Sequence, residues 1–251
     1  MSDTDIKTAV KEKYGEIATK SGSCCGPACG CGTDTGVSAT IISNGLYEGE
    51  DTELRSNADL GLGCGTPTAF ADMEQGMTVL DLGSGAGIDV FLAARKVGPA
   101  GRAIGVDMTE AMIRRAEENK TKLNAANTEF RLGEIENLPV AAGTVDRILS
   151  NCVINLVPDK RRAFAEMYRV LKPGGKFTVS DIVSRGEMPD SVRKDMSEWA
   201  GCVAGAVDRE AYLDIARQAG FRDVTVVSER EYTLHPSLAF GLQSITVSGT
   251  K

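Results

Sequence analysis

The chain has 251 residues, of which 42% are hydrophobic and 25% charged, and this composition is typical of a globular protein with a full apolar core. With 28 basic and 35 acidic residues, its net charge is −7, which argues against binding to nucleic acids or anionic membranes. The start of the chain does not resemble a leader, and no apolar run is long enough to cross a bilayer. We therefore expect a cytoplasmic protein.

Helical and strand patterns follow an irregular beginning. Residues 5–20 predict a short helix, and the Cys- and Gly-rich segment 21–36 predicts a loop or lid with little to bury. From Thr78 onward, short apolar runs predict strands over 79–82, 102–107, 128–132, 145–150, 176–183, 222–234 and 240–249. Helical spacing predicts helices over 87–97, 159–171, 190–201 and 208–219. It also predicts a helix that begins after Thr109, which can act as its cap.

This alternation predicts an α/β fold with a mostly parallel, seven-stranded sheet and helices on both faces. Leu171-Lys-Pro-Gly-Gly175 is typical of a turn that ends a helix. We divide the chain into an N-terminal cysteine-rich lid, 1–69, and one sheet-containing domain, 70–251.

A glycine-rich turn follows the first predicted strand of the domain. Gly83, Gly85 and Gly87 lie between that strand and a helix N-terminus, where the backbone can approach a ligand closely. A dinucleotide fingerprint requires a glycine at position 88, which is Ile88 here. The spacing, with Asp81 two residues ahead, instead resembles motif I of the Rossmann-like S-adenosylmethionine-dependent methyltransferases.

Further markers of that fold follow in the expected order. Asp107 ends the second strand, 24 residues after Gly83, where a carboxylate can bind ribose hydroxyls. The resemblance implies that Asp107 and Met108 hold the ribose and that Glu134 and Ile135 hold the adenine. It also implies that the methionine part lies against Asp81, Gly83, Ser84, Gly85 and Gly87.

Cysteine and histidine are both candidate ligands and catalysts, and cysteine is the more informative of the two. The single histidine, His235, precedes Pro236 and is typical of a turn, so imidazole metal sites and Cys–His catalysis are disfavoured. The seven cysteines are expected to be reduced thiols, which bind soft ligands. Cys152 follows the fourth strand at the usual ligand edge, Cys202 follows the fifth strand and a helix, and Cys64 has glycine on both sides.

The segments around these three cysteines carry a more specific resemblance. Asn151-Cys-Val-Ile-Asn-Leu156, Gly63-Cys-Gly65 and Gly201-Cys-Val-Ala-Gly205 resemble the cysteine motifs of arsenite S-adenosylmethionine methyltransferases. The resemblance implies that Cys152 and Cys202 bind trivalent arsenic and that Cys64 completes the thiolate set. It implies that Cys24 or Cys25, with Cys25 preferred, pairs with Cys64 as a disulfide during turnover. It also implies that Tyr14 and Asn151 contact the cofactor.

The implied chemistry suits the residue types. Thiolates hold thiophilic arsenic while its lone pair faces the methyl group of S-adenosylmethionine. Attack makes arsenic formally pentavalent, and two cysteines that close as a disulfide return it to the trivalent state. Thioredoxin or glutathione is the expected reductant of that disulfide. Trivalent arsenic is then the substrate of a detoxifying, monomeric enzyme.

Other interpretations remain open. The acceptor can be a small organic molecule, or the chain can be a thiol-rich metalloid-binding protein without enzymatic activity. Four N-terminal cysteines exceed what the family needs, and they suit an additional arsenic trap, a zinc or iron–sulfur element, or incidental thiols; they are Cys24, Cys25, Cys29 and Cys31.

Overall fold

The computed structural model describes residues 2–19, 46–47, 49–50, 52–186, 188–189, 193, 203–232 and 240–251. Its strands are β1 Thr78–Leu82, β2 Arg102–Asp107, β3 Thr128–Leu132, β4 Val145–Asn151, β5 Leu171–Arg185, β6 Arg222–Tyr232 and β7 Gly241–Thr250. Its α-helices are α1 Asp3–Thr19, α2 Thr52–Ala58, α3 Ile88–Val97, α4 Glu110–Lys122, α5 Lys160–Val170 and α8 Arg209–Gln218. None of the helices in these ranges is long and apolar enough to span a bilayer.

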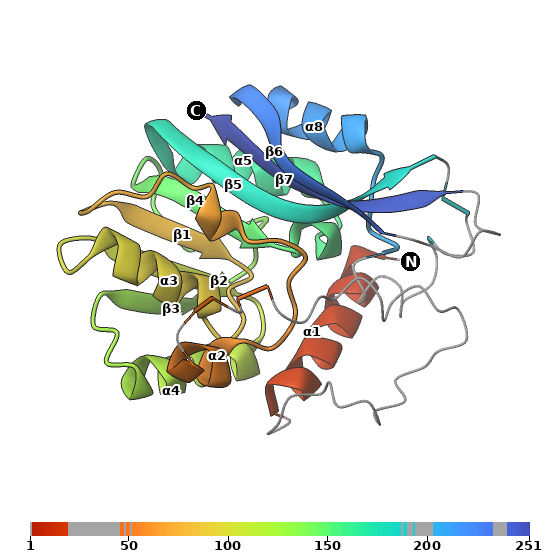
Figure 1. Cartoon of the computed structure of the whole chain (residues 1–251). Helices are drawn as coiled ribbons and strands as arrows, with labels where there is room; N and C mark the ends of the chain where they lie inside the picture. Colours follow the sequence, from red (N-terminus) through yellow and green to blue (C-terminus); the bar gives the residue numbers. More distant parts are fainter. Residues whose placement is uncertain are drawn as a thin grey trace.

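The strands form one seven-stranded sheet in the order β3-β2-β1-β4-β5-β7-β6 (Figure 1). β3, β2, β1, β4 and β5 pair in parallel, whereas β7 is antiparallel to both β5 and β6. The predicted mostly parallel sheet is confirmed. The order of strands reverses direction at β1, because β2 and β3 lie on one side of it and β4 on the other. Ligands of such sheets bind at the carboxyl ends of the strands at this point.

The core lies on both faces of the sheet because successive strand residues point to opposite sides. In β1, Leu80 and Leu82 join an apolar cluster with α5 and α8, and Val79 joins a second cluster with α3. Phe164 of α5 makes edge-to-face contacts with Phe177 of β5 at a centroid distance of 5.7 Å. These two clusters fix the central strands and therefore the positions of their carboxyl ends.

Several local predictions differ from the structure. Helix α5 ends at Val170 as expected, but β5 begins at once, because Leu171 already pairs with Val145 of β4. The predicted turn is an irregularity within this strand pair, with Gly174 at φ +77°. Helix α2 was not predicted, and the expected helix over 190–201 lies outside the described residues except for Arg193.

A buried carboxylate lies between β5 and α8. Asp181 is inaccessible to solvent, and its Oδ2 accepts a hydrogen bond of 3.1 Å from the hydroxyl of Tyr212. Burial raises the pKa of Asp181 to about 7, although the positive charge of Lys160 opposes this shift. The folded protein therefore binds this proton more tightly than an unfolded chain does.

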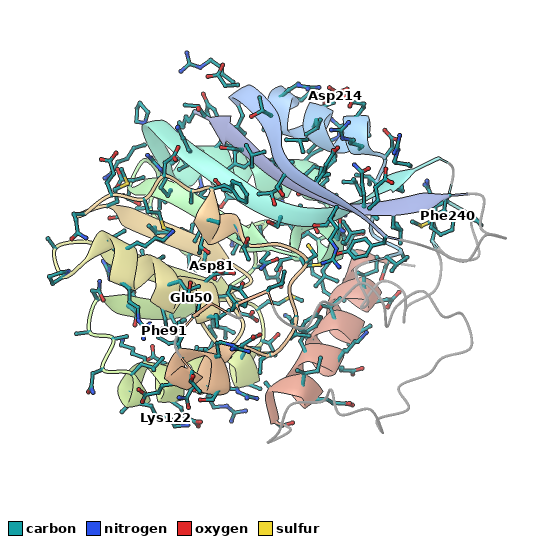
Figure 2. The ribbon with its side chains drawn as sticks, in the orientation of Figure 1. Glu50, Asp81, Phe91, Lys122, Asp214 and Phe240 are labelled. Atoms are coloured by element: carbon teal, nitrogen blue, oxygen red, sulfur yellow. The ribbon has the colours of Figure 1, made fainter. Side chains whose placement is uncertain are left out.

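This shift predicts how stability depends on pH. Because an unfolded aspartate has a pKa of about 3.9, the contribution of Asp181 to stability is lost as the pH rises from about 4 through about 7. We expect Asp181→Asn to reduce the fall in melting temperature over that range and to stabilise the protein above about pH 7. Thermal unfolding measured as a function of pH tests this, with Asp214→Asn on the exposed side of α8 as the control (Figure 2). A pH profile of Asp181→Asn that is parallel to the wild type would contradict the prediction.

Candidate functional site

The glycine-rich turn connects β1 to α3 in a conformation that side chains rarely adopt. Gly83, Gly85 and Gly87 have φ values of +66°, +50° and +97°. A Cβ atom at Gly83 would lie 2.4 Å from a methyl group of Val153, so the loop after β4 packs directly on this turn. The Gly83 N–H donates to the carbonyl of Val106 at 2.8 Å. The turn is therefore fixed between β2 and β4 and leaves its other side open to a ligand.

Asp107 at the end of β2 connects this turn to the next loop. Its Oδ2 accepts from the Gly85 N–H at 3.0 Å, and its Oδ1 accepts from the Thr109 N–H at 2.8 Å. Burial raises the pKa of Asp107, and these two donors oppose that shift. The expected cap was assigned wrongly in one respect: Thr109 occupies the N-cap position of α4, but its side chain makes no capping hydrogen bond. The Thr109 side chain is hydrogen-bonded to Asp107 instead, and the Asp107 carboxylate retains lone pairs for a ligand.

A pocket opens at the carboxyl ends of β1, β2 and β4, and α1 (red in Figure 1) lies along it. It encloses about 1060 Å³, part of it open to solvent. Of the residues expected to bind the cofactor, ten line it: Tyr14, Asp81, Gly83, Ser84, Gly85, Asp107, Met108, Glu134, Ile135 and Asn151. Gly87 does not line the pocket, because it is the N-cap residue of α3 and packs against Phe91 and Phe130. Figure 2 shows Asp81 near the middle of the molecule.

Six carboxylates line this pocket, and the two most buried, Asp81 and Asp89, lie on either side of the glycine-rich turn. Burial raises the pKa of Asp81 well above its ordinary value, and the charges of Asp89 and Asp107 raise it further. Burial also raises the pKa of Asp89 to about 6, although hydrogen bonds from Tyr47 and Asn151 oppose this shift. A cation bound in the pocket would relieve this repulsion.

Two polar atoms of the pocket are buried without a partner among the described residues. They are Oδ1 of Asp89 and the hydroxyl oxygen of Ser84. Buried polar atoms of this kind are usually satisfied by a ligand or water. The sulfonium and ammonium groups of S-adenosylmethionine are cationic, so the donor set and the glycine cradle fit this molecule.

Helix α1 closes one side of the pocket through charged contacts. The Lys7 ammonium lies 2.8 Å from a carboxylate oxygen of Glu134 and 3.0 Å from one of Glu136. The hydrogen bond from Lys7 lowers the pKa of Glu134. Arg115 of α4 donates to the carbonyl of Ala18 near the other end of α1, at 3.2 Å. The loop that is expected to bind adenine therefore holds α1 in place through the ion pairs of Glu134 and Glu136 with Lys7.

The backbone at Cys152 is strained. This residue directly follows β4 with φ +62°, a conformation that is uncommon for residues other than glycine. Its N–H donates to the carbonyl of Ser180 at 2.7 Å, which holds the turn against β5. Cys152 is buried and lines the pocket, as its predicted place at the end of a central strand requires.

Cys64 reaches the same region from the segment between α2 and β1. It is buried and shares one apolar cluster with Cys152, together with residues of α1, β5 and β7. Its flanking glycines are explained by close contacts. A Cβ atom at Gly63 would lie 2.8 Å from Nδ2 of Asn151, and one at Gly65 would lie 2.5 Å from Oγ of Ser180. Cys202 and Cys25 lie outside the described residues, as do Cys24, Cys29 and Cys31.

Sequence reasoning missed four residues that organise the site. Asp89 stands in the first turn of α3, where an acidic residue is a recognised helix-start signal, so its position could have been noticed. Lys7 and Lys11 are spaced to share one helix face, but nothing local indicates their partner Glu134. Tyr47, whose hydroxyl donates to Oδ2 of Asp89 at 2.9 Å, has no local signal.

The carboxylate of Asp89 predicts pH-dependent binding of S-adenosylmethionine. Because its pKa is about 6, acidification removes a negative charge from a pocket that fits a cation. We expect the Kd to rise about tenfold from about pH 8 to about pH 5, which corresponds to a difference of about 1.4 kcal/mol. Asp89→Asn should weaken binding at the higher pH and reduce this pH dependence. Isothermal titration calorimetry measures both effects.

Tyr47→Phe provides a control that keeps the Asp89 carboxylate but changes the pH at which affinity is lost. Its hydroxyl lowers the pKa of Asp89, so its removal should move the loss of affinity to higher pH. The same pH dependence in the wild type and in Asp89→Asn would contradict the assignment of this carboxylate to the cation.

Comparisons with known proteins agree with this geometry. Residues 73–220 match the family described as methyltransferase domain. An arsenite methyltransferase from Halobacterium salinarum is 48% identical over 91% of this chain and 60% of its own length. The Homo sapiens arsenite methyltransferase is 32% identical over 93% of this chain and 63% of its own length.

A crystal structure gives the same result. The arsenic(III) S-adenosylmethionine methyltransferase from Chlamydomonas reinhardtii is 34% identical with a TM-score of 0.70, over 82% of this chain and 72% of that one. The chain spans only 60% and 63% of the two curated relatives named above. The family match, the high identity and the shared fold nevertheless agree. The chain therefore belongs to the methyltransferase domain family and, within it, to the arsenic(III) S-adenosylmethionine methyltransferases.

Proposed function

We propose that the protein transfers a methyl group from S-adenosylmethionine to trivalent arsenic held by thiolates. The observation that carries this proposal is the position of Cys152. It lies on the wall of the carboxylate-lined pocket and also in the apolar cluster that contains Cys64. Thiolates bind soft trivalent arsenic, and the shared wall brings such an acceptor next to the cofactor.

Each part of the pocket has a distinct task in this proposal. S-adenosylmethionine, when bound, supplies a methyl group on a positively charged sulfur. Asp107 and Met108 hold its ribose, Glu134 and Ile135 its adenine, and Tyr14 covers it from α1. Its methionine part lies against the glycine-rich turn with Asp81 and Asp89. The apolar side chains around the two thiols exclude water, which helps to prevent competing hydrolysis.

Cys64, Cys152 and Cys202 form the proposed arsenic site. The arsenic lone pair forms the new bond to carbon, and the carbon–sulfur bond breaks with its electron pair retained by the departing sulfur. Arsenic is thereby oxidised by two electrons. Cys25 and Cys64, in closing as a disulfide, reduce it again, and thioredoxin or glutathione reduces the disulfide. Four thiols therefore take part: Cys64, Cys152 and Cys202 bind arsenic, and Cys25 closes the disulfide with Cys64.

We propose that residues 1–69 cover a catalytic domain formed by 70–251. This division is supported by the residues of the first segment that line the pocket, among them Lys7, Tyr14 and Gly63. The ion pair from Lys7 to the partly exposed Glu134 gives the cover a salt-sensitive attachment, whereas the pair to the buried Glu136 is screened less.

A product assay tests the function directly. Reduced protein is incubated with arsenite, glutathione and S-adenosylmethionine, and the arsenic species are then separated. We expect methylated arsenic from the wild type and at least about 100-fold less from Cys152→Ser, because the hydroxyl does not hold the arsenic in place. The melting temperature of the variant shows that it is folded. Asp107→Ala serves as a second variant that loses cofactor binding.

Two results would contradict the proposal. If Cys152→Ser methylates arsenite as fast as the wild type, the thiolate site is wrong. If the wild type binds the cofactor but forms no methylated arsenic, the acceptor is to be sought among small organic molecules.

A further inference from the structure

Asn151 makes an unusually complete set of hydrogen bonds at the border of the pocket. Its Oδ1 accepts from two consecutive backbone groups, the N–H of Cys64 at 3.1 Å and the N–H of Gly65 at 3.2 Å. Its Nδ2 donates to the carbonyl of Gly65 at 2.7 Å and to the hydroxyl of Tyr47 at 3.0 Å. A longer contact of 3.5 Å joins Nδ2 to Oδ2 of Asp89. Both lone-pair sites and both N–H groups of the amide are therefore used by the protein.

Three of these five contacts go to the loop that carries Cys64, and Asn151 itself directly precedes Cys152. Asn151 thus contacts the backbone of Cys64 and is bonded covalently to Cys152. The backbone after Asn151 cannot shift easily, because β4 pairs with β1 and β5 and the Cys152 N–H is bound to Ser180. The Cys64 loop is therefore held relative to a rigid strand end.

Other features of the loop agree with a fixed position. Gly63 and Gly65 have no room for a Cβ atom, as the contacts with Asn151 and Ser180 show. The hydroxyl of Ser244 donates to the carbonyl of Cys64 at 2.7 Å, which attaches the other side of the loop to β7. Both the N–H and the carbonyl of Cys64 are thus held, by different strands.

We propose that Asn151 is a positioning residue, which holds the Cys64 thiol at the distance from Cys152 that a shared arsenic atom requires. This inference rests on the proposed function, because it assumes that the two thiols share one substrate. It assigns the amide to the arsenic site rather than to the cofactor. The amide is fully occupied within the protein, whereas two other polar atoms of the cofactor pocket, on Ser84 and Asp89, are buried with no partner in the part of the chain that the structure describes.

The expected effect follows from the chelation of arsenic. The second thiol binds intramolecularly, so its contribution depends on its effective concentration near the first. In Asn151→Ala, two N–H groups and one carbonyl of the loop lose their partner, and the loop can occupy positions in which Cys64 no longer faces Cys152. Chelation should weaken far more than cofactor binding.

The experiment uses the full chain in a two-cysteine background. Serine replaces Cys24, Cys25, Cys29, Cys31 and Cys202, so that only Cys64 and Cys152 remain. The probe is phenylarsine oxide, which forms two arsenic–sulfur bonds with a pair of thiols while its oxygen and the two thiol protons leave as water. Its Kd and that of S-adenosylmethionine are measured by calorimetry, and the melting temperature is recorded for each variant.

Asn127→Ala is the matched control. Asn127 also holds two backbone groups through its amide, the carbonyls of Ala94 at 2.9 Å and Gly98 at 2.8 Å, but it precedes β3 and does not line the pocket. We expect Asn151→Ala to weaken binding of phenylarsine oxide at least about tenfold. At about pH 8, where Asp89 is ionised with or without its contact to Asn151, the Kd for S-adenosylmethionine should change less than about threefold. Asn127→Ala should leave both values within about twofold of the background.

The outcomes separate this inference from the function on which it rests. Unchanged binding of phenylarsine oxide by Asn151→Ala would overturn the inference, provided that Cys64→Ser in the same background weakens it. An equal loss of affinity for both ligands would overturn it as well, since that result indicates a general structural role. If the two-cysteine protein itself does not chelate the probe, the proposed pairing of Cys64 with Cys152 is wrong and the inference fails with it.

Discussion

The parallel pairing of β4 between β1 and β5 is the constraint on which the site depends. It places the carboxyl end of β4 beside the glycine-rich turn after β1, so close that Gly83 can have no side chain next to Val153. The same strand end continues into Cys152, which has a left-handed backbone conformation and lines the pocket. The cofactor region and the first thiol are therefore adjacent because of sheet topology, before any side chain makes a contact.

The charge of the pocket is the second organising feature. Burying Asp81, Asp89 and Asp107 within one cavity is unfavourable for the protein alone, and this is the reason why the pKa of each is raised. Such an arrangement is retained where a ligand supplies the opposite charge. Backbone N–H groups from Gly85 and Thr109 reduce the penalty at Asp107, whereas Asp89 keeps one oxygen without a partner. Asp107 is accordingly suited to neutral hydroxyl groups and Asp89 to a cation.

The sequence predicted the parts of the site that local patterns encode. Short apolar runs around glycines located β1 and the turn after it, and the spacing of Asp107 identified the end of β2. Cys152 was identified because it follows a strand whose apolar residues predict that it is buried. The contacts between distant segments could not be found in this way. Asn151, Tyr47 and Asp89 meet across three separate parts of the chain, and nothing in the neighbourhood of any one of them indicates the other two.

The failures of local prediction have a common physical origin in competition for hydrogen-bonding groups. Thr109 has the composition of a helix cap, but its hydroxyl, like its N–H, is hydrogen-bonded to the Asp107 carboxylate two residues earlier. Leu171-Lys-Pro-Gly-Gly175 has the composition of a turn, but strand pairing with β4 begins at its first residue. In each case a nearby partner satisfies the group before the pattern's usual partner can, so the residue type was read correctly and its partner was not.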